Sequence, residues 1–285
     1  MNNIEVRGLI KEYKNFHLGP IDLDIPKGVI VGFIGENGSG KTTTIKLILN
    51  LIKRNEGSIK IFGKELKEDH GILNDVGVVF DELNLHSFLT ATEVDKIFDN
   101  VFVNWSSEDF FKYLKKLNLD DSKQIKAYSR GMKMKLSLAI ALSHQAKVLI
   151  LDEATSGLDP VVRDEILEIL MEYIQNEENS IFISSHILSD LQKVSDYIAF
   201  IHEGKMVFVE EKDRLLEEYV IAYCDSDRVN SFDSDNIIGR IDTGVNTKLL
   251  VKKEFVSDDL VTEKPEIEDF MIFIRKGQKN GKINI

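Results

Sequence analysis

Residues 29–42 read VIVGFIGENGSGKT, an apolar run that passes into a glycine-rich turn and ends in lysine and threonine. The apolar run predicts a short buried strand. The residues that follow place Ile45, Ile48, Leu49 and Ile52 on one face at helical spacing. A strand, a turn matching G-x-x-x-x-G-K-[ST] and a helix, in this order, are the context of a phosphate-binding loop.

The residue types of the turn fit the chemistry of binding ATP. Glycines let the backbone approach phosphates and point its N–H groups at them, and the positive end of the following helix faces the anion. Lys41 can bridge the β- and γ-phosphates, the Thr42 hydroxyl can ligate Mg²⁺, and Thr43 can reach another phosphate oxygen. The alternative, a glycine-rich turn with an incidental lysine, leaves the flanking strand and helix unexplained. The predicted nucleotide-binding residues are Gly35, Glu36, Asn37, Gly38, Ser39, Gly40, Lys41, Thr42 and Thr43.

Two carboxylates follow a second apolar run, VLILDE at residues 148–153. An enzyme with a phosphate-binding loop needs an acid at the end of a neighbouring strand for its Mg²⁺ shell, and Asp152 fits this role. Glu153 is then placed to polarise the attacking water as general base. Taken alone, an Asp-Glu pair after a strand more often caps a turn, so the assignment depends on the upstream loop.

The remaining pattern predicts an α/β fold. Apolar strands alternate with helices, which is typical of a parallel sheet covered on both faces. Alternation at residues 4–10 predicts an edge strand, and alternation at 58–62 predicts a half-buried one. The expected strands of the parallel sheet are residues 29–34, 76–80, 148–151, 181–184 and 197–202, and the expected helices are residues 160–175 and 187–194.

Two segments depart from the alternation of strand and helix. Between residues 88 and 145 apolar side chains recur at helical spacing, which predicts an inserted helical subdomain with Trp105 in its core,. After residue 214 the pattern ends, and short strands at 219–224 and 248–251 precede a helix at 265–275. We therefore predict a domain at residues 1–214 and a small α+β appendage at residues 215–285, whose role the sequence leaves open.

Three further segments make residues 4–214 resemble the ATP-binding cassette (ABC) family. Residues 128–132 (YSRGM) stand where the family has its LSGGQ signature, residues 156–160 (SGLDP) match its D-loop, and residues 184–186 (SSH) match its switch histidine. The resemblance implies a P-loop NTPase (RecA-like) core with a parallel sheet and an antiparallel β subdomain. It also implies ATP hydrolysis.

The resemblance extends the set of candidate site residues. In the family two subunits pair head to tail around two ATP molecules, so Ser129 and Gly131 would bind the partner's ATP and Asp159 would couple the two sites. His186 would contact the γ-phosphate and act with Glu153 and Lys41 in catalysis; a satisfied surface or core histidine is the alternative. Tyr13 stands where the family keeps an aromatic residue that stacks on adenine, with Phe16 as an alternative and plain packing as another.

The sequence also departs from the family pattern. Arg130 and Met132 replace a glycine and a glutamine of the signature. Asp81, followed by Glu82, replaces the usual Q-loop glutamine. A carboxylate can also ligate Mg²⁺, so Asp81 joins Thr42 and Asp152 as a metal candidate, with capping of a turn as its competing role. These variants and residues 265–271 (PEIEDFM) resemble bacterial cassettes that export drugs, bacteriocins and bacitracin.

Composition bounds the remaining possibilities. The 285 residues are 43% apolar and 29% charged, as in an ordinary globular protein,. A net charge of −12 argues against a nucleic-acid partner,. One cysteine, Cys224, excludes an internal disulfide, and no apolar stretch is long enough to span a bilayer,. We therefore expect a cytoplasmic chain that reaches the inner face of the membrane only through a partner.

The resemblance implies an ATPase that powers a separate polytopic membrane subunit, which we expect to be an exporter. ATP would close a homodimer or heterodimer, and hydrolysis would reopen it. One alternative is a soluble ABC ATPase of DNA repair or translation, although the chain lacks long coiled-coil or zinc insertions and a second cassette. Another is a regulatory module without hydrolysis, which the presence of Lys41, Glu153 and His186 disfavours.

Overall fold

The centre of the molecule is a six-stranded sheet in the order β10-β9-β3-β8-β7-β6. The computed structural model describes residues 1–66, 70–225, 228–229, 232–233, 236–244, 246–257 and 259–277. All strands of this sheet run parallel except β10, which is antiparallel to β9. Their bounds are β3 Ile30–Ile34, β6 Val76–Val79, β7 Val148–Asp152, β8 Ser180–Ser184, β9 Tyr197–His202 and β10 Lys205–Glu211. The predicted α/β fold class is confirmed, although β10 was not foreseen.

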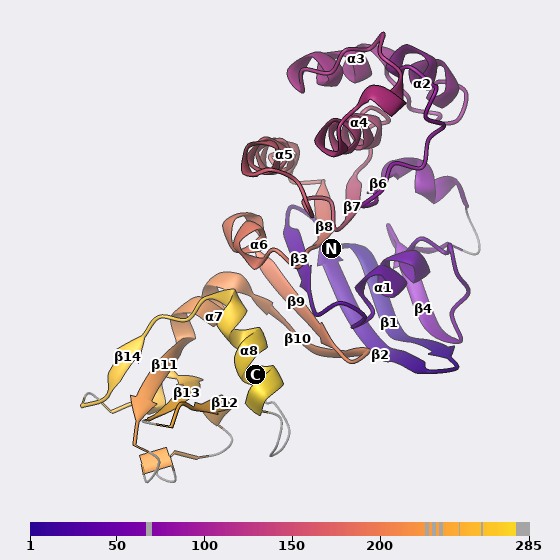
Figure 1. Cartoon of the computed structure of the whole chain (residues 1–285). Helices are drawn as coiled ribbons and strands as arrows, with labels where there is room; N and C mark the ends of the chain where they lie inside the picture. Colours follow the sequence, from indigo (N-terminus) through magenta and orange to yellow (C-terminus); the bar gives the residue numbers. More distant parts are fainter. Residues whose placement is uncertain are drawn as a thin grey trace.

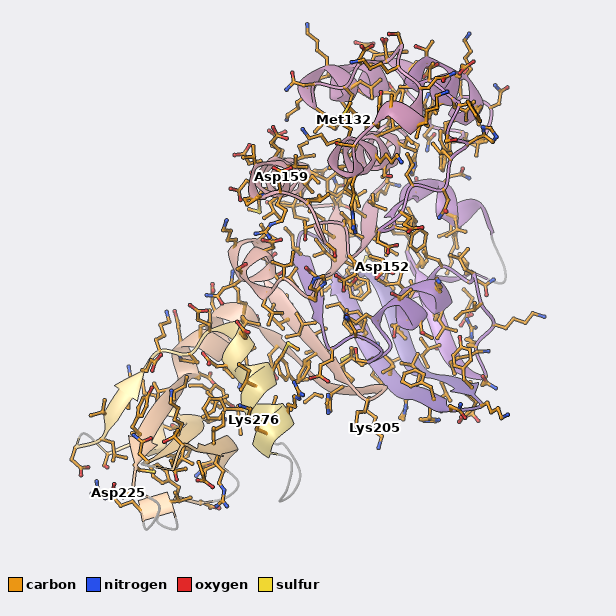
Figure 2. All side chains as sticks on the ribbon, viewed as in Figure 1. Met132, Asp152, Asp159, Lys205, Asp225 and Lys276 are labelled. Atoms are coloured by element: carbon orange, nitrogen blue, oxygen red, sulfur yellow. The ribbon has the colours of Figure 1, made fainter. Side chains whose placement is uncertain are left out.

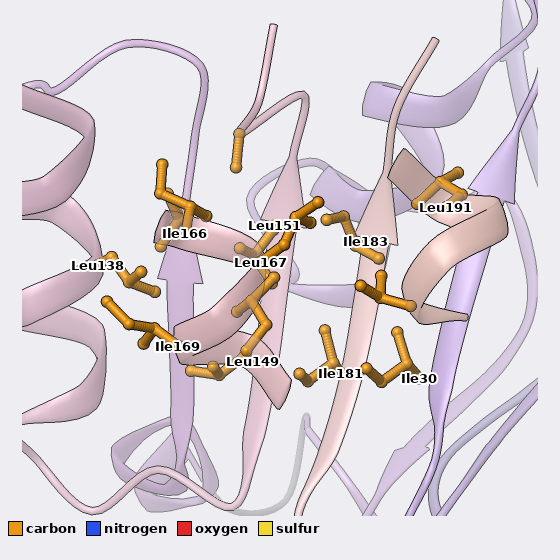
Figure 3. Close-up of a cluster of buried hydrophobic side chains, with 14 of the residues drawn as sticks. Ile30, Leu138, Leu149, Leu151, Ile166, Leu167, Ile169, Ile181, Ile183 and Leu191 are labelled. Atoms are coloured by element: carbon orange, nitrogen blue, oxygen red, sulfur yellow. The ribbon is translucent and has the colours of Figure 1, made fainter. Parts of the chain in front are cut away.

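Both faces of the parallel part of this sheet are buried, which is why strands such as β3 and β7 are almost entirely apolar,. Along β7, Leu149 and Leu151 belong to the core cluster under the helices, whereas Val148 and Ile150 belong to the cluster on the opposite face. Figure 3 shows the first cluster, where side chains of β7, β8 and β3 meet those of the covering helices. These helices are α4 Arg130–Leu142, α5 Pro160–Tyr173 and α6 Leu188–Val194.

The opposite face is covered by α1 and a four-stranded antiparallel sheet in the order β2-β1-β4-β5 (Figure 1). The prediction of an edge strand near residues 4–10 was wrong, because β1 pairs with β2 on one side and with β4 on the other. Pairing with β4 spans a long stretch of sequence, which local alternation cannot reveal. The bounds are β1 Asn2–Tyr13, β2 Phe16–Pro26, α1 Lys41–Ile48, β4 Glu56–Ile61 and β5 Lys64–Glu65.

The chain between β6 and β7 forms a helical lobe, which is at the top of Figure 1. It contains α2 (Ala91–Phe98), α3 (Ser107–Lys116) and the beginning of α4. Trp105 stacks on Phe98 and on Phe102, with ring centroids 5.5 and 6.3 Å away, and those two rings are 5.6 Å apart, so the aromatic stripe packs the lobe as expected. None of the helices in the described part of the chain is long and apolar enough to cross a bilayer.

The last part of the chain forms a third sheet, in the order β12-β13-β11-β14, with α8 lying on one face. Figure 1 places this unit beside β10 and α6, away from the helical lobe. The α+β character of this C-terminal unit agrees with the prediction. The division of the chain into a domain at residues 1–214 and an appendage at residues 215–285 stays a prediction. The bounds are α7 Lys212–Glu218, β11 Tyr219–Cys224, β12 Ile237–Asp242, β13 Thr247–Lys252, β14 Val261–Glu263 and α8 Ile267–Gly277.

Candidate functional site

The glycine-rich loop joins β3 to α1 and wraps around the side chain of Lys41. Gly38 and Gly40 have φ angles of 81° and 116°, which other residues rarely adopt,. A Cβ atom on Gly40 would also lie 2.5 Å from Cδ1 of the buried Leu18, so a side chain here would force Leu18 to shift. Lys41 is buried, and its Nζ donates to the carbonyl oxygens of Gly35 at 2.7 Å and Glu36 at 3.2 Å. The ammonium group is thereby held at the centre of the loop.

A cavity of about 380 Å³ opens in front of this loop. Most of the predicted loop residues line it, together with Asp81, Glu153 and His186, which come from three other segments of the chain. Gly35 and Ser39 are buried behind the loop, where a Cβ atom on Gly35 would lie 2.5 Å from Oγ of Ser39. The lining residues are Phe16, Glu36, Asn37, Gly38, Gly40, Lys41, Thr42, Thr43, Asp81, Glu153, Ser156 and His186.

The two carboxylates after β7 have different surroundings. Asp152 is only 3% exposed, and its Oδ1 accepts a hydrogen bond of 2.7 Å from Ser184 Oγ at the end of β8. Glu153 turns away from the strand with a φ angle of +55°, a conformation that costs a non-glycine residue energy and often marks a functional position,. Its N–H is held by the backbone and side-chain oxygens of Ser184, both at 3.1 Å. Ser184 therefore holds the carboxylate of Asp152 and the backbone of Glu153.

The side chain of Glu153 lies between Lys41 and His186. Its Oε1 is 3.5 Å from Lys41 Nζ, and its Oε2 is 2.5 Å from His186 Nδ1. The backbone N–H of His186 donates to the same Oε2 at 3.3 Å. Lys41 and His186, which lie far apart in the sequence, thus meet at the Glu153 carboxylate. This carboxylate lines the cavity and can accept a proton from a water molecule.

Three predicted site residues lie away from this cavity, at the start of α4 and α5. Ser129 caps α4 by accepting from Met132 N at 3.2 Å, and Asp159 caps α5 by accepting from the N–H of Val162 at 3.1 Å. A Cβ atom on Gly131 would lie 3.3 Å from Cγ1 of Val162, so the two helix starts touch. Figure 2 shows Met132 and Asp159 toward the helical lobe, apart from Asp152.

The unusual Arg130 of the signature segment also has a defined place. Its guanidinium lies against Gly157 of the D-loop segment, where a Cβ atom would be 2.7 Å from the Arg130 Nη1. Arg130 also lines a second cavity of about 480 Å³ together with Asp81 and Glu82. The two departures from the family pattern therefore lie beside the same cavity, and Asp81 borders both cavities.

The two aromatic candidates for stacking on adenine are separated by the structure. Phe16 lines the cavity, whereas Tyr13, paired with it across the turn between β1 and β2, is 46% exposed and does not. Lys11 Nζ lies 5.3 Å from the centre of the Tyr13 ring. The geometry favours Phe16, the alternative considered from the sequence, and stacking by Tyr13 stays a prediction.

Sequence reasoning missed two functional positions. Ser184 was noted only as part of the SSH segment, and its contacts with Asp152 and Glu153 depend on the neighbouring placement of β7 and β8. Ser156, read only as the start of the D-loop segment, lines the cavity. In both cases the sequence contained the motif, but it could not predict the direction in which the serine side chain points.

Comparison with known proteins agrees with this geometry. The family model described as ABC transporter matches residues 18–156. The chain is 36% identical over 213 residues to the lantibiotic transport ATP-binding protein SrtF of Streptococcus pyogenes, covering 74% of this chain and 91% of that protein. It is also 36% identical over 208 residues to the bacitracin transport ATP-binding protein BcrA of Enterococcus faecalis, covering 72% of this chain and 68% of that protein.

The fold has solved counterparts as well. The structure of an ATP-binding subunit of an ABC transporter superimposes with a TM-score of 0.68 at 26% identity, covering 74% of this chain and 91% of that one. The predicted resemblance to the ABC family, including its bacteriocin and bacitracin transport branch, is thereby confirmed. The predicted P-loop NTPase core is confirmed with it.

Proposed function

This chain belongs to the ABC transporter family as an ATP-binding subunit, and we propose that it hydrolyses ATP with Lys41, Glu153 and His186 as its catalytic residues. Hydrolysis of ATP coupled to transport is the activity of this family. The single observation that carries the residue assignment is the Glu153 carboxylate between Lys41 and His186 at the mouth of the glycine-rich loop.

The glycine-rich loop binds the triphosphate. Its backbone N–H groups and the N-terminus of α1 provide positive potential. Lys41 exchanges the carbonyl oxygens of Gly35 and Glu36 for phosphate oxygens, an exchange favoured because charged acceptors form stronger hydrogen bonds,. Phe16 or Tyr13 provides a surface on which adenine stacks.

The donor set beside the loop fits Mg²⁺. The hydroxyl of Thr42 and the carboxylates of Asp152 and Asp81 are hard oxygen donors, which this ion prefers. Thr42 and Asp81 line the cavity, and Asp152 is oriented by Ser184 Oγ. When bound, Mg²⁺ neutralises part of the charge that develops on the phosphate oxygens during hydrolysis.

Glu153 acts as general base toward the attacking water. Its carboxylate is anchored by the N–H and Nδ1 of His186, which keeps it directed at the cavity without covering both oxygens with strong donors. The distance of 3.5 Å to Lys41 leaves that contact weak enough to yield when Lys41 turns to phosphate. His186 remains beside the same carboxylate and can then contact the γ-phosphate.

A head-to-tail dimer completes the site. Ser129, Gly131 and Asp159 lie at the touching ends of α4 and α5 and do not line the cavity of their own chain. The N-terminus of α4 is suited to bind the phosphate of a second chain's ATP. Arg130, held against Gly157, joins the two segments that face the partner. ATP then lies between two chains, which makes closure depend on ATP.

The dimer drives a separate polytopic membrane subunit, and the chain is peripheral on the cytoplasmic face of the membrane through that partner. Large apolar side chains are exposed on the helical lobe, which supports docking there. These residues are Phe88, Ile97, Val101 and Val103. We extend the proposal to export of membrane-active peptides, because the relatives SrtF and BcrA are transport proteins for a lantibiotic and for bacitracin.

The test is steady-state phosphate release by the purified full-length chain with Mg²⁺ and ATP, together with the dissociation constant for ATP. Lys41→Ala should weaken ATP binding and abolish turnover, because Lys41 is the buried cation of the loop. Lys46→Ala, an exposed lysine on the same helix, is the matched control and should behave as wild type. Equal ATP affinity in Lys41→Ala and wild type would refute the assignment.

A further inference from the structure

Helix α8 is held by its buried apolar face and by a hydrogen bond at its first turn. Ile267, Phe270, Phe273 and Ile274 are at most 2% exposed and belong to the cluster that also covers the parallel sheet. The Phe270 ring meets that of Tyr219 at 5.6 Å and 80°. At its first turn, the N–H of Ile267 donates to Oε1 of Gln192 in α6 at 3.2 Å. These contacts hold α8 against the core from its first turn to Ile274, the residue before Arg275.

The last turn of α8 reaches the phosphate-binding loop. Arg275 Nη1 lies 3.1 Å from Oε1 of Glu36. Glu36 is the residue whose carbonyl oxygen accepts from Lys41 Nζ at 3.2 Å and from the N–H of Ser39 at 3.1 Å. The C-terminal unit thus contacts the side chain of Glu36, whose carbonyl oxygen accepts hydrogen bonds within the phosphate-binding loop.

The ion pair between Arg275 and Glu36 affects the charge of the cavity. Three carboxylates line it, those of Glu36, Asp81 and Glu153, and the single ammonium is that of Lys41. An excess of negative charge at its walls disfavours a triphosphate. Arg275 brings a permanent positive charge to the carboxylate of Glu36 and so offsets part of this excess,.

We propose that Arg275 is a positioning residue of the nucleotide site, supplied by the C-terminal unit, and that it strengthens ATP binding by neutralising and tethering Glu36. The proposal rests on the function proposed above. It gives residues 215–285 a role in nucleotide affinity, with a nucleoside triphosphate as the ligand concerned. Because Arg275 acts through Glu36, its removal changes binding of ATP and leaves the chemical step intact.

The first experiment measures the dissociation constant for ATP of the full-length chain at low and high salt. Arg275 and Glu36 are 68% and 41% exposed, so the effect of an ion pair of this kind is modest,. Arg275→Ala should raise the dissociation constant and KM about two- to fivefold with kcat unchanged, and about 0.5 M salt should remove most of the difference. Arg275→Lys should restore part of the affinity.

The matched control is Lys276→Ala, which removes the same charge one residue later. Lys276 forms no ion pair with any residue in the described part of the chain, so this variant should bind ATP as wild type does. An equal loss of affinity in Lys276→Ala and Arg275→Ala would show a general charge effect and overturn the proposal.

A double-mutant cycle with Glu36→Gln isolates the contact. Arg275→Ala should have no further effect on ATP affinity when Glu36 is already glutamine. A full additional loss in that background, or unchanged affinity of Arg275→Ala in the wild-type background, would overturn the proposal. Lys41→Ala distinguishes failure of this proposal from failure of the proposed function. If the proposed function is wrong, ATP affinity survives the loss of Lys41. If only the role of Arg275 is wrong, Lys41→Ala still weakens ATP binding.

Discussion

Replacing Glu153 by glutamine keeps the shape of the side chain and removes its charge. In the structure this carboxylate is 3.5 Å from Lys41 Nζ and 2.5 Å from His186 Nδ1. A unit charge pair at this first distance interacts by about 5 kcal/mol at an effective dielectric constant of 20, before the cost of desolvation. The variant therefore loses the base and also frees Lys41 to bind phosphate.

The two effects predict opposite changes in turnover and affinity. A positioned general base contributes about 10²- to 10⁴-fold to a reaction rate, so kcat of Glu153→Gln should fall by a factor in this range. ATP affinity should be equal to or higher than that of wild type. With binding intact and hydrolysis blocked, the ATP-bound dimer should accumulate. Phosphate release, equilibrium binding of ATP and size-exclusion chromatography with light scattering measure the three quantities.

The control is Glu168→Gln, which removes a negative charge from an exposed position on α5. It should leave turnover and oligomeric state as in wild type. A Glu153→Gln variant that retains more than about a tenth of wild-type kcat would refute its role as general base. A variant that no longer binds ATP would refute the inference that Glu153 competes with phosphate for Lys41.

Three further outcomes follow from the structure. Phe16→Ala should raise the KM for ATP more than Tyr13→Ala does, with kcat little changed in both; the reverse order in ATPase assays would restore Tyr13 as the stacking residue. Burial lowers the pKa of His144 from its ordinary 6.5, so below about pH 6.5 the unfolded chain takes up a proton that the folded chain does not,. The free energy of unfolding should thus be highest above that pH and decrease below it. In urea titrations, His144→Phe should reduce this decrease. Phe182→Ala, in the centre of the sheet, should cost about 3–5 kcal/mol of stability, whereas Leu51→Ala at an exposed position should cost less than about 0.5 kcal/mol in the same measurement,.

The parts of the site that are local in sequence could be predicted. Lys41 and Thr42 follow from a strand, a turn and a helix that are consecutive, and Asp152 and Glu153 from a strand that ends in two acids. In each case the covalent chain itself fixes the neighbours. His186 required the family resemblance, because nothing in its own surroundings distinguishes it from an ordinary surface histidine.

The parts that depend on pairing of distant strands could not be predicted. The interior position of β1 results from pairing with β4, and the roles of Ser184 and Phe16 result from neighbouring strands. Strand β2 does carry a local signal, because the buried side chains of Ile21, Leu23 and Ile25 alternate along it. No local pattern connects Arg275 with Glu36, since only the packing of α8 brings them together.

Coupling to a membrane subunit can be tested by purifying the tagged protein from gently solubilised membranes of its native cell, with mass spectrometry and ATPase assays of what is recovered. We expect to recover a polytopic membrane protein in stoichiometric amount, and ATP hydrolysis that Lys41→Ala abolishes. Recovery with ribosomes or DNA, and without any membrane protein enriched over an untagged control, would contradict this coupling.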